Sequence, residues 1–180
     1  MTEFIDHPGT EMRVWLWQTW AERVTGILIW ETVWWTSGTA FPDPEKPQNP
    51  YGDAMSWVSD ETMAPGTKQA WGNGDGRFLY PPPAAADGGP TAPVLDGPVD
   101  SYRLELLRDG IEDYEYFVIL KRLLDEKAAQ LDPRTRESLR ALLTVPADVS
   151  ASLTSLTRDP ATIEAHRDKL ARAIVDLQKR

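Results

Sequence analysis

Residues 10–30, TEMRVWLWQTWAERVTGILIW, combine a helical pattern with a short apolar run, and this combination decides the predicted fold class. Apolar residues recur at every fourth position, so we expect residues 10–24 to form a helix with one apolar face. Thr10 can cap the beginning of this helix, and Gly26 can follow its end. The face consists of Met12, Leu16, Trp20 and Val24.

The run ILIW at residues 27–30 is continuous, apolar and rich in β-branched side chains. Such a run without alternation is typical of a parallel strand that is buried on both faces. A helix, a tight turn and a buried strand together form one unit of an α/β fold. The sequence therefore predicts an α/β architecture for the front of the chain.

The middle of the chain has a different composition, because residues 36–100 hold 11 of the 15 prolines and 9 of the 12 glycines. Loops of this length are usually functional or disordered. Residues 77–80 are expected to form a short strand that Pro81 ends, and residues 84–93 a mobile loop. We therefore predict one part with long loops at 1–100 and a helical part at 101–180.

Helical patterns dominate from residue 101 onward. Gly110 interrupts the predicted helix at 101–126, which indicates close packing or a kink there. The expected buried face of this helix consists of Leu104, Leu107, Ile111, Tyr114 and Val118.

Three prolines mark the expected beginnings of later helices. Asp132-Pro133 and Asp159-Pro160 each combine an N-cap residue with a proline in the first turn, and Pro146 is expected to begin a short helix between them. The apolar stripe of the last helix consists of Ile163, Leu170, Ile174 and Leu177.

Composition excludes several classes of site. The 180 residues contain no cysteine and two histidines, so disulfides and thiolate metal sites are impossible and no cofactor or metal is expected. No apolar stretch approaches the roughly 20 residues that span a bilayer, and no signal peptide is visible. Residues 1–100 carry 5 Lys and Arg against 14 Asp and Glu, and this charge disfavours nucleic acid as a partner.

The segment GILIWETVWW at residues 26–35 is the first candidate for chemistry. Residues at the C-terminal end of a barrel strand face the active site, and Trp30, Glu31 and Trp34 lie at that end of the predicted strand. An indole can stack on the apolar face of a sugar ring. The alternative is that both tryptophans pack in a core or an interface.

The segment WGNGDGRFLYPP at residues 71–82 is the second candidate. It lacks the glycine spacing of a dinucleotide fingerprint, the G-K-[ST] of a phosphate-binding loop and the later Glu of a calcium loop. It is either a glycine-rich hairpin or a loop that lines a ligand pocket, in which Asp75 accepts hydrogen bonds from hydroxyl groups.

The segment SYRLELLRDGIEDYEYF at residues 101–117 is dense in charge. Paired carboxylates can perform acid–base work in glycoside hydrolysis, but carboxylates on a helix surface are more often solvated or paired with arginine. We interpret five of these residues as structural ion-pair formers: Arg103, Arg108, Asp109, Glu112 and Asp113. His7 and His166 have no partner at ligand spacing.

Three segments together resemble one family. Residues 4–35 are similar to its late barrel helix and strand, and residues 71–82 to its motif W-G-x-G-D-G-x-x-x-Y-P. Residues 97–117 resemble its element G-P-V-x-S-x-R-L-E-x-L-R-D-G-I-E-D-Y-E-Y. The family is glycoside hydrolase family 123, also called domain of unknown function 4091, and the resemblance covers about residues 3–125.

The resemblance implies a (β/α)8 barrel that acts on N-acetylhexosaminides, with N-acetyl-β-galactosaminidase as the characterised type. Its mechanism is substrate-assisted, and an adjacent Asp-Glu pair orients the acetamido group and protonates the leaving oxygen. That pair lies upstream in the family, and Asp60-Glu61 falls in the wrong place for it. A complete barrel needs about 250 residues. The chain is therefore expected to be the C-terminal part of a barrel followed by a helical bundle, inactive on its own.

In this interpretation Trp30, Trp34 and Asp75 contact carbohydrate. The five charged residues fix the barrel end and the glycine-rich loop. The missing N-terminal half of the barrel is a possible partner. The localisation of the parent protein stays open. Two alternatives also stay open: a non-catalytic carbohydrate-binding or interaction module, and a remnant without a function of its own.

Overall fold

The computed structural model describes residues 3–60, 62–88 and 93–179, and the chain divides into two compact units. The first, called here the helical unit, consists of Pro8–Ile27 and Leu106–Arg180. The second, called the loop unit, consists of Thr2–His7 and Leu28–Glu105. The first helix of the chain thus belongs with the C-terminal helices, while the segment between them forms a unit of its own.

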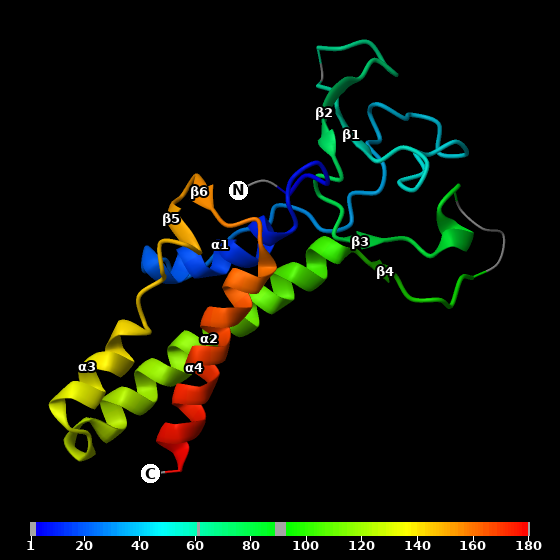
Figure 1. The fold of residues 1–180 in the computed structure, drawn as a ribbon. Coiled ribbons are helices and arrows are strands. Elements are labelled where there is room, and N and C mark those ends of the chain that lie inside the picture. Colours follow the sequence, from blue (N-terminus) through cyan, green and yellow to red (C-terminus); the bar gives the residue numbers. More distant parts are fainter. Residues whose placement is uncertain (1–2, 61, 89–92, 180) are drawn as a thin grey trace. The chain divides into compact units, whose positions relative to one another are not determined.

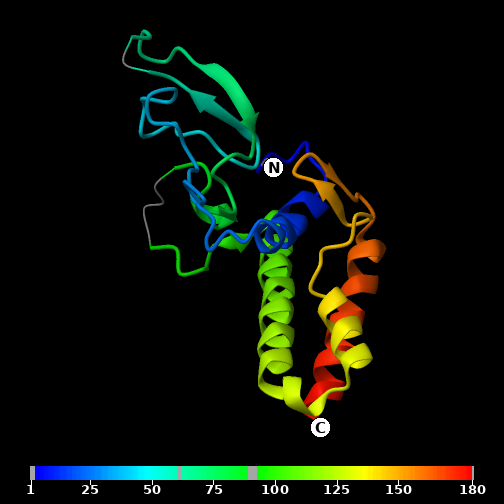
Figure 2. The ribbon, with the colours of Figure 1, turned by 90° about the vertical axis from the view of Figure 1, so that its left-hand side faces the viewer.

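Over its described residues, the helical unit contains four α-helices, one short 3-10 helix and one hairpin (Figures 1 and 2). The predicted helices at its beginning, after residue 101 and after both Asp-Pro pairs are confirmed. Its elements are α1 (Thr10–Ala21), α2 (Tyr102–Lys127, whose first turn lies in the loop unit), η2 (Ala128–Gln130), α3 (Pro133–Ala141), β5 (Ser150–Ser152), β6 (Ser155–Leu156) and α4 (Pro160–Gln178).

One apolar cluster holds this unit together, and α1, α2 and α4 supply most of it. Trp17 and Phe117 are fully buried and meet edge to face, with 5.1 Å between their ring centroids. The predicted stripe of α4 is confirmed, because all four of its residues are buried. The cluster consists of Val14, Trp17, Phe117, Leu120, Leu123, Leu124, Leu131, Val149, Ile163, Leu170, Ala173, Ile174 and Leu177.

The buried face of α2 differs from the predicted one. Ile111 is 47% exposed and Val118 is 37% exposed, so the prediction is wrong for both. The real face includes Gly110, Asp113 and Phe117. A Cβ at Gly110 would lie 2.7 Å from the carbonyl oxygen of Arg13, which shows that α1 crosses α2 at this glycine. An apolar pattern cannot reveal a face that contains a glycine and a carboxylate.

Both Asp-Pro pairs act as predicted. The side chain of Asp132 accepts hydrogen bonds from the backbone amides of Arg134 and Thr135, and that of Asp159 accepts one from Ala161. These acceptors satisfy amides that have no partner inside the helix. The helix expected after Pro146 is absent, because a turn leads directly into the antiparallel hairpin β5–β6.

The end of α1 is closed by an arginine in the left-handed region. Arg23 has φ 58°. The amide of Val24 donates to the carbonyl of Thr19, and the amide of Arg23 donates to the carbonyl of Trp20. These two bonds form a Schellman motif, in which the left-handed position usually holds glycine. The prediction that Gly26 closes the end of this helix is therefore wrong. The N-cap is Gly9 rather than Thr10.

Substitution of Arg23 with glycine is expected to stabilise the helical unit by about 0.5–1 kcal/mol. A left-handed conformation costs a non-glycine residue about 1–2 kcal/mol. The greater freedom of glycine in the unfolded chain offsets about 0.4–1 kcal/mol of that gain. Urea unfolding measures the effect as a higher midpoint at unchanged slope. A lower midpoint would show that the arginine side chain contributes more to stability than its backbone costs.

The described part of the loop unit contains two small antiparallel sheets. β1 (Met55–Val58) pairs with β2 (Gln69–Asn73), and β3 (Leu79–Tyr80) pairs with β4 (Val99–Asp100). A short helix η1 (Pro83–Ala85) follows β3. The expected strand at residues 77–80 is thus confirmed for its second half, and the loop expected at 84–93 lies partly outside the described residues.

A fully buried arginine organises the long loops of this unit. Nε of Arg77 donates to the carbonyl of Trp34 at 2.8 Å, and Nη2 donates to Oε1 of Gln48 at 2.9 Å and to the carbonyl of Met55 at 3.2 Å. Since a planar guanidinium has five donors in fixed directions, one side chain can tie several backbone segments together. The loops are therefore fixed by polar contacts rather than by a large apolar core.

Residues 27–30 do not form the predicted strand. The segment has no strand assignment, and Leu28 is 82% exposed and Trp30 52% exposed. In the part of the chain that the structure describes, no backbone hydrogen bond pairs this run with a neighbour. The expected burial on both faces is wrong here, because no parallel strands flank the run within the described residues. No described helix is long and apolar enough to cross a bilayer.

Candidate functional site

The structure brings Trp30, Trp34 and Asp75 together in the loop unit. The indoles of Trp30 and Trp34 meet edge to face, with 5.2 Å between ring centroids and 70° between ring planes. Nε1 of Trp30 donates to Oδ1 of Asp75 at 3.3 Å. Asp75 is 8% exposed, whereas half of Trp30 is open to solvent. The result is an exposed indole beside a nearly buried carboxylate.

Glycines in the loop after β2 make this approach possible. Gly74 and Gly76 have φ angles of 74° and 69°, which other residues rarely adopt. A Cβ at Gly76 would lie 2.8 Å from Cζ2 of Trp30 and 3.2 Å from Cβ of Trp34. The loop therefore turns at two glycines, and one of them also leaves room for both indoles.

Backbone contacts fix the tryptophan segment to the glycine-rich loop. The amide of Trp34 donates to the carbonyl of Gly76 at 2.9 Å, and Val33 forms an isolated antiparallel bridge with Arg77. Oγ of Ser56 donates to the carbonyl of Asp75 at 2.8 Å. The geometry of the three candidate residues thus depends on a side-chain hydrogen bond from Ser56 in β1 and on backbone contacts of Val33 and Trp34 with the loop.

Arg103 also holds the glycine-rich loop, although not through the carboxylates of its own helix. Its guanidinium donates to the carbonyls of Gly74 at 2.7 Å and Arg77 at 2.5 Å, and to that of Glu3. Burial lowers the pKa of Arg103 from its ordinary value. The contact with the loop agrees with the sequence interpretation, but the acceptors are peptide oxygens.

Glu3 is a residue of this site that sequence reasoning missed. Its pKa is raised because the side chain is partly buried and because the carboxylate of Asp75 lies nearby. Oε2 of Glu3 is buried and has no hydrogen-bond partner among the described groups. Glu3 precedes the predicted helix and belongs to no motif, so the sequence held no signal for it.

The raised pKa of Glu3 predicts a local pH dependence. Protonated Glu3 contributes stability that is complete below its ordinary pKa of 4.5 and is lost as the pH rises through the higher folded value. Glu3→Gln is expected to remove this loss, because the amide does not titrate and places no negative charge beside Asp75. The loss of stability is measured as a fall, with rising pH, in the hydrogen-exchange protection of the Gly74 amide, corrected for intrinsic exchange rates. If protection fell equally with pH in wild type and in Glu3→Gln, local stability would not depend on the titration of Glu3.

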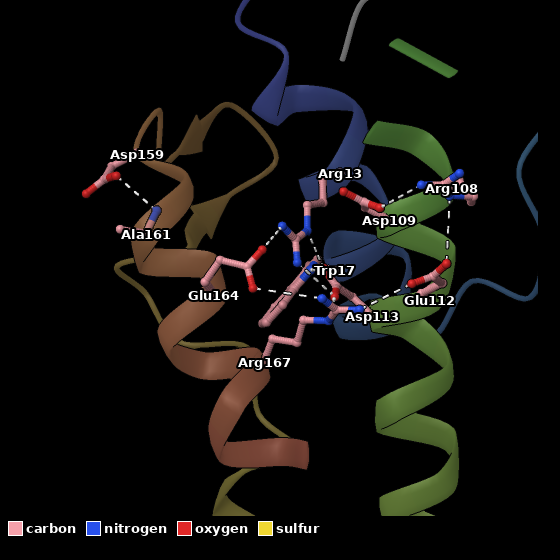
Figure 3. Close-up of polar contacts among 10 residues, drawn as sticks. All are labelled: Arg13, Trp17, Arg108, Asp109, Glu112, Asp113, Asp159, Ala161, Glu164 and Arg167. Atoms are coloured by element: carbon pink, nitrogen blue, oxygen red, sulfur yellow. Dashed lines mark hydrogen bonds and ion pairs between the residues drawn. The ribbon is translucent and has the colours of Figure 1, made fainter. Parts of the chain in front are cut away.

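The other charged residues selected from the sequence lie in the helical unit (Figure 3). Arg108 lies 3.7 Å from Asp109 and 3.8 Å from Glu112, with all three partly or largely exposed. Glu112 also pairs with Arg167 at 3.2 Å. Exposed pairs of this kind contribute at most about 1 kcal/mol. These groups are ion-pair partners, and none of them joins the three candidate sugar-contact residues within the loop unit.

Asp113 differs from these neighbours because it is fully buried. Its carboxylate accepts hydrogen bonds from Nε and Nη2 of Arg13 at 2.6 and 3.0 Å and from Nε1 of Trp17 at 2.8 Å. Nε of Arg167 lies 3.0 Å away, and Arg13 also pairs with Glu164. Figure 3 shows how this network joins α1, α2 and α4. The network is thus a structural centre of the helical unit.

The described residues offer no metal centre. They contain no group of three or more His, Asp or Glu side chains arranged around a common point. His166 is buried, its Nε2 lies 3.2 Å from the carbonyl of Leu142, and burial lowers its pKa. These features fit a histidine of the core. Of the pair Asp60-Glu61, Glu61 lies outside the described residues.

Comparison with protein-family models, curated proteins and solved structures finds no match to this chain. The likeness to glycoside hydrolase family 123 therefore rests on the motif residues quoted above. Two of the resembling segments, residues 4–35 and 71–82, meet in the loop unit through Trp30, Trp34 and Asp75.

Proposed function

We propose that this chain supplies the sugar-contact side of a glycoside hydrolase site for N-acetylhexosaminides, as the C-terminal part of a family 123 type (β/α)8 barrel. One observation carries the proposal: Asp75 lies 41 positions after Trp34 and 45 after Trp30, yet the three side chains meet in one cluster. Two of the three resembling segments contribute to this cluster.

The chemistry of the cluster suits a neutral sugar. An exposed indole offers a flat π surface to the C–H face of a pyranose ring. The carboxylate of Asp75 can accept a hydrogen bond from a hydroxyl or from an acetamido N–H. The loop unit carries 4 Lys and Arg against 13 Asp and Glu, and this negative charge disfavours anionic sugars.

The unpaired run at residues 27–30 supports the barrel as the parent fold. Leu28 and Trp30 are exposed, and the backbone of the run has no strand partner among the described residues. A parallel neighbour from the remaining part of a barrel would satisfy both features. We propose that such a part would also supply the adjacent Asp-Glu pair that protonates the leaving group, so this chain binds substrate without turnover.

A titration with N-acetylgalactosamine tests the binding proposal. We expect the indole N–H resonance of Trp30 to shift on binding, and galactose, which lacks the acetamido group, to bind more weakly. Trp30→Ala is expected to weaken binding about tenfold. Trp71→Ala is the matched control, because Trp71 is also exposed, at 62%, and lies in the same unit. Equal losses in both variants would refute a specific indole contact.

Hydrolysis of 4-nitrophenyl N-acetyl-β-galactosaminide separates binding from catalysis. We expect no release of nitrophenol above the buffer rate. Turnover by this 180-residue chain, abolished by Asp75→Asn, would instead place a complete active site within it.

A non-catalytic carbohydrate-binding module is the second candidate. It is favoured by the fact that the cluster and all of its backbone anchors lie within a single unit. Both candidates predict binding. A separately expressed N-terminal half of a barrel distinguishes the two candidates. Only the hydrolase proposal predicts that adding this half restores hydrolysis.

A further inference from the structure

A cavity lies in the helical unit and is independent of the cluster proposed above to contact carbohydrate. Its volume is about 560 Å³, within the range of small-molecule pockets. It opens between the end of α1, the middle of α2 and the segment that follows α3. The lining residues on which the argument depends are Trp20, Arg23, Val24, Tyr114, Lys121 and Leu143.

The aromatic wall of this cavity is fixed before any ligand arrives. Trp20 and Tyr114 meet edge to face at 5.6 Å, and Trp20 stacks on the buried ring of Phe117 at 5.1 Å. Nε1 of Trp20 donates to the carbonyl of Leu143 at 2.7 Å. A ligand therefore meets a preformed apolar surface, which lowers the entropic cost of binding.

The charged groups at the cavity are both cations. Arg23 and Lys121 line it, and none of its lining residues is acidic. Lys121 is already paired with Asp125 at 2.9 Å. No hydrogen bond or ion pair of the Arg23 guanidinium forms within the part of the chain that the structure describes, so this charge is available to a ligand.

The backbone of Arg23 points to the same conclusion. The residue occupies a left-handed position, with φ 58°, where glycine would be less strained. Backbone strain of this kind tends to occur at ligand clamps and other functional positions. Here it places a guanidinium beside an aromatic wall.

We propose that this cavity binds a small amphipathic monocarboxylate, with its aromatic or alkyl body on Trp20 and Tyr114 and its carboxylate on the guanidinium of Arg23. A guanidinium matches the planar carboxylate through two parallel hydrogen bonds. The apolar walls bury the rest of the ligand. The cavity is thus a binding site separate from the carbohydrate-contact cluster.

Three probes of one shape and different charge test the proposal: 2-naphthylacetate, 2-naphthylacetamide and 2-(2-naphthyl)ethylammonium. Binding is followed by the indole N–H resonance of Trp20, assigned with Trp20→Phe. We expect the carboxylate to bind at least tenfold more tightly than the amide, and the ammonium to bind most weakly.

Arg23→Gly is the decisive variant, because glycine suits the left-handed backbone and the fold is retained. It is expected to reduce the affinity for the carboxylate to that for the amide, whereas Arg23→Lys retains part of the difference. Arg122→Ala removes an exposed cation of α2 that does not line the cavity, and it should change nothing. Equal affinity for all three probes, no detectable binding, or unchanged affinity in Arg23→Gly would each overturn the proposal.

Discussion

Replacement of Asp113 with alanine is expected to lower the free energy of unfolding of the helical unit by about 3–5 kcal/mol. The carboxylate is fully buried and holds the guanidinium of Arg13, which is itself only 4% exposed. Without it, a buried cation has no close counter-charge on α2, and the indole N–H of Trp17 loses its acceptor. Urea unfolding followed by circular dichroism measures the change.

Two further variants separate this loss from the removal of any aspartate. Asp125→Ala removes an exposed carboxylate from the same helix and should cost less than about 1 kcal/mol. The double variant Arg13→Met, Asp113→Leu replaces the buried pair with apolar groups and should recover much of the stability. A loss below about 1 kcal/mol in Asp113→Ala would show that water reaches the network.

Gly110→Val is expected to destabilise the helical unit by about 2–3 kcal/mol, although valine has a higher intrinsic helix propensity than glycine. A Cβ at this position would lie 2.7 Å from the carbonyl oxygen and 3.1 Å from Cα of Arg13. Both atoms belong to the backbone of α1, so relief requires α1 to move. That movement would also disturb the ion pair of Arg13 with Asp113.

Glu115→Val is the matched control for the glycine substitution. Glu115 is an exposed residue of the same helix, and a valine there should change stability by no more than about 0.5 kcal/mol. If Gly110→Val unfolds at the same urea concentration as wild type, the two helices do not cross as closely as the structure shows.

Local signals in the sequence predicted the helices well. Asp132 and Asp159 cap their own helices through amides two or three positions away, so the beginnings of α3 and α4 depend on adjacent residues alone. The last helix is also amphipathic in the simple sense, because its buried face is almost entirely apolar. Such features need no knowledge of the rest of the fold.

The face of α2 was not predictable in the same way. Its centre contains Gly110 and Asp113, and each is explained by Arg13, about 100 positions earlier in the chain. Glycine and aspartate weaken an apolar pattern, and Ile111 and Val118 then mark the wrong side. Long-range partners decided this face, and periodicity carries no information about them.

The candidate site shows the same limit. The sequence selected Trp30, Trp34 and Asp75 for their chemistry, and the geometry that joins them comes from Gly76 and from backbone bonds. Glu3 was missed because nothing local distinguishes it from a solvated carboxylate. Its pKa is raised first by burial in the folded loop unit and then by Asp75, 72 positions away.

The discontinuous helical unit has a consequence for synthesis on the ribosome. α1 emerges early, but its partner carboxylates, Asp113 and Glu164, follow 100 and 151 positions later. At about 5–20 residues per second, α1 therefore waits on the order of ten to thirty seconds for α4. During that interval the nascent chain exposes the apolar face of α1, while the contiguous segment 28–105 is already complete. A holdase-type chaperone is expected to engage this apolar face during translation.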